Sequence, residues 1–325
     1  MGAYPAPLVP LHPGERLDHF RIDAIVATSG MATIYRATDQ ISGCTVAIKL
    51  PHFEMESDPV FFDRFQREEA IGTTLSHPGI VKVVPEKHRS RVYLVLEWVE
   101  GRLLRQVLNE DGKLAPERAV RLALQVCEAL DYMHAQGVVH RDLKPENIMV
   151  NADERLKLID FGIASKAGAR RLTFGKLSKT QGTPEYVSPE QVKGKRGNAR
   201  SDIYSLGVIL YEMLTGETPF NGSDPFLVMN AKTRSAPPPP RKVAAEIPPA
   251  LEAIVLRALE RDPLNRYHDA RELAWDLEHP DQVTEHRNPE ARQEAAGNSR
   301  VFRYVLLSLI PLFIFALLLF VAAHS

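Results

Sequence analysis

An acid, a base and an amide lie close together in the stretch 140–147, whose sequence is HRDLKPEN. They are Asp142, Lys144 and Asn147, and an apolar run at 148–150 follows them. A carboxylate can accept a proton, and amide and carboxylate oxygens are ligands for hard cations. A loop that only turned the chain would have no reason to hold these side chains together. We therefore interpret the stretch as a centre of chemistry rather than as a connecting turn.

Two further motifs accompany this stretch. Asp160 opens the triplet Asp-Phe-Gly thirteen residues after Asn147, behind the alternating run 156–159. Lys49 closes the partly β-branched run 46–48, upstream of both. In this order the three motifs resemble the protein-kinase signature set: a strand lysine, a catalytic loop and a magnesium-binding Asp-Phe-Gly. The sequence Asp-Leu-Lys-Pro-Glu-Asn resembles that of serine/threonine kinases, since tyrosine kinases typically lack the lysine at this position.

The resemblance covers residues 16–279 and implies an α+β fold, the two-lobed protein-kinase fold. We expect a β-rich small lobe at about 16–99 and an α-rich large lobe at about 100–279, after a disordered segment at 1–15. The sequence predicts strands at 20–26, 33–38 and 92–96, and helices at 59–75, 116–136, 201–214 and 270–277.

The resemblance also implies a role for each charged residue of the motifs. Asp142 would accept or orient the proton of the substrate hydroxyl, and Lys144 would reach the transferring phosphate. Asn147 and Asp160 would bind Mg²⁺, with Mn²⁺ as an alternative metal. The implied reaction transfers the γ-phosphate of ATP to Ser or Thr hydroxyls of protein substrates.

The small lobe would hold most of the ATP molecule. Lys49 would contact the α- and β-phosphates, and a helix glutamate would keep it in place. Glu68 and Glu69 compete for that role. The stretch Arg-Phe-x-Arg-Glu, followed by His-Pro, is similar to bacterial members of the family and favours Glu68. The backbone of Glu97 and Val99 would bind the adenine at the hinge between the lobes.

Of the motifs in this sequence, the glycine-rich loop departs most from the protein-kinase pattern. The resemblance places it at Val26, Ala27, Ser29, Gly30 and Ile34, where only Gly30 is a glycine. Glycine serves there because the backbone must approach the phosphates closely. Small residues still permit that approach, so we expect weaker closure. This departure leaves a second hypothesis open, a pseudokinase scaffold that signals by binding; retention of the strand lysine, the catalytic aspartate and both metal ligands opposes it.

A long segment rich in Lys, Arg, Ser and Thr lies between Gly162 and Glu190. It resembles the activation segment, and its closing half contains Ser188 where alanine is usual. Arg141 is the cation that a phosphorylated residue of this segment would meet. A plain basic loop is the alternative. The candidate phosphorylation sites are Thr180 and Ser178, ahead of Thr173.

Two structural pairings follow from the same resemblance. Asp202 is expected to hold the backbone of the catalytic loop, and Arg266 is expected to pair with Glu190 across the large lobe.

The carboxy-terminal part has a different character. Residues 304–323 contain no charge, and a helix of this length spans about 30 Å, the thickness of a bilayer core. A buried core helix is the alternative, but such helices rarely lack a polar stripe. Arg300 and Arg303 precede the run, and positive charge marks the cytoplasmic side. We expect a single-pass transmembrane helix, joined by a polar linker at 280–300, that anchors a cytoplasmic kinase domain to the bacterial inner membrane.

The overall composition argues against other classes. A formal net charge of −1 gives no reason to expect nucleic acid as a partner. Cys44 and Cys127 are the two cysteines, which favours a reducing compartment without disulfides. The amino terminus lacks the features of a secretory signal. The expected partners are protein substrates with Ser or Thr, the membrane, and a second copy in a homodimer for autophosphorylation.

Overall fold

The structure, a computed structural model, describes residues 10–52, 59–160, 165–166 and 184–283. The chain divides into two compact units, 1–280 and 281–325, and nearly all described residues belong to the first. In the described ranges no helix is both long and apolar enough to cross a membrane. The predicted transmembrane helix, the three candidate phosphorylation sites and most of the predicted linker lie outside these ranges.

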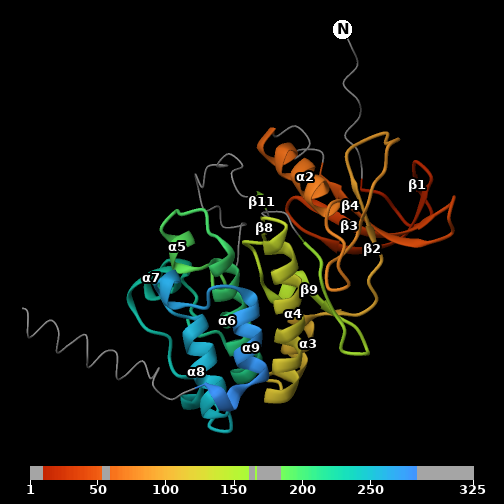
Figure 1. Cartoon of the computed structure of the whole chain (residues 1–325). Helices are drawn as coiled ribbons and strands as arrows, with labels where there is room; N and C mark the ends of the chain where they lie inside the picture. Colours follow the sequence, from red (N-terminus) through yellow and green to blue (C-terminus); the bar gives the residue numbers. More distant parts are fainter. Residues whose placement is uncertain (1–9, 53–58, 161–164, 167–183, 284–325) are drawn as a thin grey trace, which may run out of the picture. The chain divides into compact units, whose positions relative to one another are not determined.

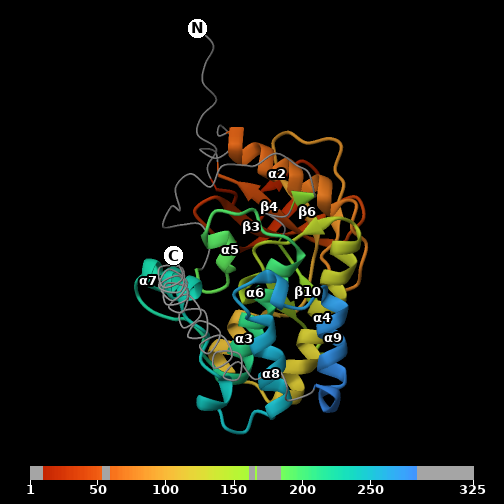
Figure 2. The same cartoon turned by 60° about the vertical axis from the view of Figure 1, so that its left-hand side comes forward.

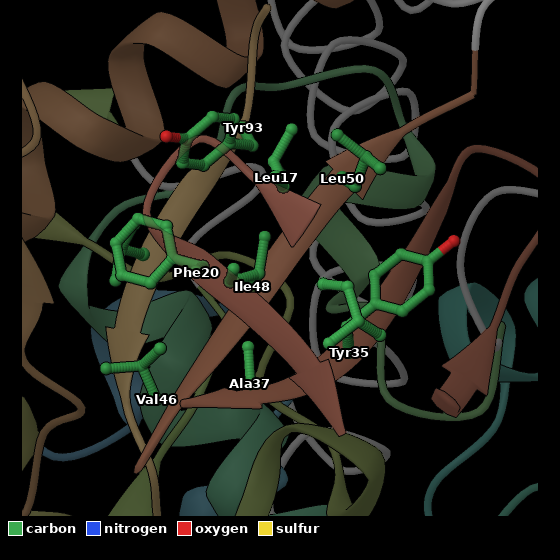
Figure 3. Packing of buried hydrophobic residues seen from close by; sticks show 10 residues of the cluster. Leu17, Phe20, Tyr35, Ala37, Val46, Ile48, Leu50 and Tyr93 are labelled. Atoms are coloured by element: carbon green, nitrogen blue, oxygen red, sulfur yellow. The ribbon is translucent and has the colours of Figure 1, made fainter. Parts of the chain in front are cut away.

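Among the described residues, six strands form the antiparallel sheet of the small lobe, in the order β1-β2-β3-β4-β6-β5 (Figure 1). The register of β4 fixes the two faces of this sheet, because successive side chains of a strand point to opposite faces. Val46, Ile48 and Leu50 pack into the buried cluster of Figure 3, with Phe20 and Tyr35. Lys49 therefore faces the other side. The strands are β1 Arg16–Leu17, β2 Phe20–Thr28, β3 Ala32–Asp39, β4 Thr45–Pro51, β5 Val83–Val84 and β6 Leu94–Glu97.

Helix α2 (Pro59–Gly72) lies against this sheet (Figure 2). It is shorter than the predicted 59–75, because the α-helical hydrogen bonds stop after Thr73, and the Thr74 amide donates instead to the Ile71 carbonyl three residues back (3.0 Å). The Thr73 hydroxyl adds a second bond to the Glu69 carbonyl (2.9 Å), and the Thr74 hydroxyl adds one to the Ile71 carbonyl (2.8 Å). Gly72 permits the close packing that follows, since a Cβ there would lie 2.1 Å from a methyl carbon of Val83 in β5.

The large lobe is mainly helical, and α6 (Ala199–Thr215) is its central helix, buried at every position from 201 to 214. The helix begins at Asn198, whose side chain accepts from the Arg200 amide, and ends at Gly216 in the left-handed region (φ 82°). Helices α4 and α8 pack against α6 (Figure 1). The other helices are α3 Leu104–Asp111, α4 Pro116–Ala135, α5 Pro189–Val192, α7 Pro225–Arg234, α8 Pro249–Ala258 and α9 Ala270–Glu278.

Short strands and 3-10 helices complete the large lobe. Strands β10 (Leu156–Leu158), β9 (Ile148–Val150) and β7 (Arg102–Leu103) form one small antiparallel sheet, and β8 (Val138–Val139) pairs with β11 (Ser165–Lys166). The 3-10 helices are η1 Pro145–Asn147, η2 Pro240–Lys242, η3 Pro263–Asn265 and η4 Pro280–Gln282. The α+β fold with a β-rich small lobe and an α-rich large lobe is thus as predicted.

Candidate active site

Lys49 shares a cross-strand row with two residues that the sequence predicts to bind the nucleotide. Ala27 in β2 pairs with Ile34 in β3, and Ile34 pairs with Lys49 in β4. Paired residues of neighbouring strands point to the same face, and the core residue Ile48 points to the opposite one. The row therefore presents a methyl group, an apolar side chain and an ammonium group on one surface.

The ammonium group of Lys49 joins the two lobes. Its Nζ donates to both carboxylate oxygens of Glu68 in α2, at 2.7 and 2.9 Å, and to Asp160 Oδ1 at 3.1 Å. Glu68 is only 4% exposed. Burial would lower the pKa of Lys49, but the carboxylates of Asp160 and Glu68 outweigh it and raise that pKa above its usual value. Lys49 is therefore a fixed cation beside the predicted metal ligand.

Glu69 points to a different partner, although it follows Glu68 directly. Its carboxylate accepts from the guanidinium of Arg89, with Nη1 at 3.2 Å from Oε2. The predicted choice of Glu68 over Glu69 as the partner of Lys49 agrees with these contacts. The roles of both residues towards a nucleotide stay predictions.

Asp202 in α6 binds the backbone of the predicted catalytic loop, residues 140–147. The Asp202 carboxylate accepts from the backbone amides of His140 (2.9 Å) and Arg141 (2.8 Å), and it lies 2.8 Å from His134 Nε2. Burial would raise the pKa of Asp202, but these donors outweigh it and keep that pKa below its usual value. Arg141 takes a left-handed backbone (φ 68°) at this point. The sequence-based expectation that Asp202 anchors the loop is confirmed.

Asp142 is surrounded by the other polar residues of its loop. Lys144 Nζ donates to Asp142 Oδ2 at 2.8 Å, and Asn147 Nδ2 donates to the Asp142 carbonyl at 2.8 Å. Because Nδ2 of Asn147 is hydrogen-bonded to Asp142, Oδ1 of Asn147 is the side-chain atom that remains to bind a cation. The loop thus combines a proton acceptor, a cation and an oxygen ligand within a few ångströms.

Hydrogen bonds within the protein occupy polar groups of Glu97, one of the two predicted hinge residues. The Glu97 amide donates to the Lys82 carbonyl (2.9 Å), and the Glu97 carboxylate accepts from Lys157 Nζ (2.6 Å). The amide and the side chain of Glu97 are therefore both hydrogen-bonded within the protein. The group of Glu97 that remains to bind adenine is its carbonyl. Val99 is half-buried in the loop after β6.

A serine closes the turn between β2 and β3 where the family has glycine. Ser29 Oγ donates to the Ala32 carbonyl (2.9 Å) and accepts from the amides of Ala32 (3.1 Å) and Met31 (3.3 Å). Residues 26–30, including Val26 and Gly30, are exposed. The hydroxyl thus gives the turn a fixed shape that glycine alone would not supply.

The end of the activation segment is pinned to the large lobe as expected. Arg266 is 2% exposed and donates to Glu190 through two bonds, Nη1 to Oε1 at 2.8 Å and Nη2 to Oε2 at 2.7 Å. Arg141, the predicted phosphate-binding cation, is buried; burial and the nearby Arg196 lower its pKa to about 10. The candidate residues that it would meet lie outside the described part of the chain.

Comparison with known proteins decides the family. Residues 22–276 match the protein kinase domain. The chain belongs to the protein kinase family. The probable serine/threonine-protein kinase PknB of Corynebacterium glutamicum is 39% identical over 269 residues, which cover 80% of this chain and 42% of that protein. PknB of Mycobacterium tuberculosis is 36% identical over 300 residues, which cover 88% of this chain and 48% of PknB.

The solved kinase domain of Mycobacterium tuberculosis PknI has a similar fold. The two structures superpose with a TM-score of 0.66 at 25% sequence identity, covering 84% of this chain and 99% of the PknI chain. The chain spans less than half the length of the curated relatives named above.

Two structural features of this chain could not be predicted from the sequence. The first is a polar cluster in which Arg105 contacts Glu146, Tyr186 and Glu212, residues that lie 41, 81 and 107 positions away. The second is Lys232, 1% exposed, which donates to the backbone carbonyls of Glu185 and Val187. Both contacts join segments far apart in the chain, so no local spacing could have indicated them.

Proposed function

We propose that this chain is an ATP-dependent serine/threonine protein kinase. The observation that carries the proposal is the contact of Lys49 with both Glu68 and Asp160, because it brings the phosphate-binding lysine of the small lobe to the metal ligand of the large lobe. The serine/threonine branch is favoured by Lys144, which contacts Asp142, and by the printed names of the PknB relatives.

The residues present fit a magnesium ion. Asp160 offers a partly exposed carboxylate and Asn147 offers Oδ1, which are hard oxygen ligands. Magnesium at such sites is typically held by one or two protein groups together with substrate phosphates and water, so it needs no larger cluster; among the described residues no group of three or more His, Cys, Asp or Glu forms one. When bound, the ion would neutralise charge on the phosphates.

The reaction follows from the positions of the charged groups. The substrate hydroxyl oxygen forms a bond to the γ-phosphorus of ATP while the bond from that phosphorus to the β,γ-bridging oxygen breaks and ADP leaves. Asp142 accepts the hydroxyl proton, and Lys144 lies beside it to neutralise the transferring phosphoryl group. Lys49 holds the phosphates that remain on ADP.

The experiment compares the full chain with Asp142→Asn, using γ-labelled ATP and a mixture of Ser- and Thr-containing peptides. Loss of the positioned proton acceptor should lower kcat by about 10² to 10⁴, while the melting temperature shows that the variant folds. Equal incorporation by the two proteins would refute the proposal. Absent incorporation in both, with ATP binding retained, would favour the pseudokinase hypothesis that the altered loop at Ala27 and Ser29 leaves open.

We also propose that residues 304–323 anchor the kinase domain to a membrane, with the domain in the cytoplasm of a bacterial cell. The uncharged run and the preceding Arg300 and Arg303 support this. Fusion of residues 300–325 to a soluble reporter should carry it to the membrane fraction. A reporter that stays entirely soluble would contradict the anchor.

Phosphorylation of Thr180, Ser178 or Thr173 by a second copy is our proposal for activation. Asp142→Asn serves as an inactive acceptor for the wild-type enzyme, so that any phosphate it gains was transferred between molecules. Mass spectrometry should find phosphate within 163–182; an unmodified segment after incubation would contradict the proposal.

A further inference from the structure

A buried lysine in α7 binds the backbone of the segment that leads into α5. Lys232 is 1% exposed, and its Nζ donates to the backbone carbonyls of Glu185 and Val187, the latter at 3.0 Å. Helices α5 and α7 pack against each other (Figure 1). Because both acceptors are main-chain atoms, Lys232 fixes a backbone conformation rather than the position of one side chain.

The carbonyl between these two acceptors is hydrogen-bonded as well. The Tyr186 carbonyl accepts from Ser205 Oγ in α6 at 2.8 Å. Three successive carbonyls therefore each have a side-chain donor, two of them from α7 and one from α6. The segment 185–187 is thus bound to two helices, and Lys232 supplies both bonds from α7.

Packing alone does not account for a lysine at this position. Burying an ammonium group costs free energy unless its donors are satisfied, and an apolar residue of similar size would fill the space without that cost. Burial indeed lowers the pKa of Lys232. The two carbonyls and the ring of Tyr204, whose centroid lies 5.4 Å from Nζ, offset part of the cost. What the lysine adds over an apolar residue is its hydrogen bonds to the segment.

The same part of the chain borders the predicted catalytic loop at two points. The Tyr186 hydroxyl contacts Arg105, and Arg105 is bonded to Glu146 in η1 at 2.7 Å. Five residues after Tyr186, Gln191 Nε2 donates to the Arg141 carbonyl at 3.1 Å. The predicted proton acceptor of the loop lies between these two points in the sequence. A peptide whose hydroxyl reaches it therefore has the segment 185–187 as a neighbour.

We propose that Lys232 is a positioning residue, which holds the backbone of 185–187 in the conformation beside which a substrate peptide binds. The inference rests on the proposed kinase function. Since 1% of its surface is exposed, Lys232 acts on the peptide through the carbonyls of Glu185 and Val187. Its loss should weaken peptide binding and should leave ATP binding at Lys49 unchanged.

The first experiment measures kcat, KM for ATP and KM for a serine-containing peptide in Lys232→Met, which removes the donors and keeps an unbranched side chain. KM for the peptide should rise by about tenfold, the scale of one lost hydrogen bond from a charged group. The kcat at saturating peptide and KM for ATP should stay within about twofold of the wild-type values. A purely structural role would reduce the folded fraction, and thus kcat, at constant KM. An unchanged KM for the peptide would overturn the proposal.

Two variants of the same helix are the matched controls. Val228→Ala shortens a side chain that is also buried, at 2% exposure, and therefore tests the loss of packing. Arg234→Met removes an exposed cation from the last turn and therefore tests the loss of charge. Val228→Ala should lower the melting temperature, and neither variant should change KM for the peptide. A rise in either control as large as in Lys232→Met would overturn the proposal.

A second measurement does not depend on activity. The Ser188 amide donates to Gln191 Oε1 at 3.1 Å, and Ser188 is fully buried, so hydrogen exchange over 184–192 reports the opening of this part of the chain. Lys232→Met should accelerate that exchange by about tenfold and leave exchange in α9 unchanged. Equal exchange over 184–192 in wild type and variant would overturn the proposal. If the wild-type enzyme phosphorylates no peptide, the proposed function fails, and the exchange measurement still decides whether Lys232 holds the segment.

Discussion

Glu68 and Glu69 are adjacent in α2, yet their carboxylates bind cations on different parts of the small lobe. Glu68 accepts from Lys49 at 2.7 Å, whereas Glu69 accepts from Arg89 at 3.2 Å. The helix therefore ties one acid to the candidate active site and the other to the segment before β6.

This difference predicts unequal effects of the same substitution. Glu68→Gln removes the charge that fixes Lys49, and misplacement of a phosphate-binding group by about 1 Å can cost roughly a hundredfold in rate. We expect kcat/KM for ATP to fall by about that factor. Glu69→Gln breaks a partly exposed pair, worth about 1 kcal/mol or less, and should leave catalysis nearly intact. Similar losses in the two variants would contradict the assignment of Glu68.

The buried pair of Glu190 and Arg266 predicts a pH-dependent stability. Burial would raise the pKa of Glu190, but its bonds from Arg266 and Ser201 outweigh it and hold that pKa below its usual value. The stabilisation is therefore fully present above about pH 4.5, the usual carboxyl value, and is lost as the pH falls through the lower, folded-state pKa.

Glu190→Gln leaves Arg266 buried without its anion, which should cost about 3–5 kcal/mol at pH 7. The difference in free energy of unfolding between wild type and variant, measured by urea titration, should shrink below pH 4.5. Glu246→Gln, in the exposed pair with Lys113, is the control and should change little at either pH. A difference that stays constant down to pH 3 would contradict the low pKa of Glu190.

The hydroxyl of Ser29 predicts an effect on ATP affinity. Ser29→Ala removes the bonds that fix the turn between β2 and β3, and the loss of one hydrogen bond, about 1 kcal/mol, corresponds to roughly fivefold. We expect KM for ATP to rise by that factor while KM for the peptide stays constant. Ser42→Ala removes a comparable turn hydroxyl, bonded to Asp39, in the β3–β4 connection. Equal KM values for ATP in both variants would show that the turn at Ser29 does not contact the nucleotide.

Lys232 predicts stability that increases with pH. Burial lowers the pKa of Lys232 to about 7, while the unfolded chain binds the proton up to the usual value near 10.5. The unfolded state thus binds more protons between these values, so the wild type gains stability as the pH rises from about 7.

Comparison with Lys232→Met isolates this effect, since methionine has no proton to lose. The free energy of unfolding of the wild type relative to the variant should rise by on the order of 1 kcal/mol per pH unit between pH 7.5 and 9.5. The same comparison with Lys113→Met, at an exposed lysine, should be flat. A flat result for Lys232→Met as well would mean that Lys232 stays charged within the fold.

The sequence predicted those parts of the fold that depend on local pattern. The helix expected at 116–136 ends at Ala135, and the one expected at 270–277 ends at Glu278. The strand expected at 92–96 is found at Leu94–Glu97 instead. Its start is displaced because the Arg89 side chain donates to the Tyr93 carbonyl at 2.7 Å, a contact that removes this carbonyl from pairing with a neighbouring strand.

The sequence predicted which residues of the site lie together where these residues are close along the chain. It did not predict contacts between residues that only the tertiary fold brings together. Asp142, Lys144 and Asn147 lie in one loop, so their proximity could be read from the sequence. Arg105 and Lys232 instead lie in the helices α3 and α7, and an arginine or a lysine in a helix is normally a surface residue. Only the packing of α3 and α7 against the rest of the large lobe shows that Lys232 is buried and that Arg105 is bonded to side chains of distant elements.

The left-handed backbone of Arg141 has a consequence for regulation. A residue with a side chain takes this conformation at a cost of about 1–2 kcal/mol, and here the Asp202 carboxylate in α6 compensates by accepting from two successive amides. The orientation of the neighbouring proton acceptor is therefore settled as soon as the large lobe folds, before ATP or peptide arrives. An on–off signal therefore has little freedom to reshape this loop, and we expect it to act instead on the contact between Lys49 and Glu68 or on the peptide-binding side.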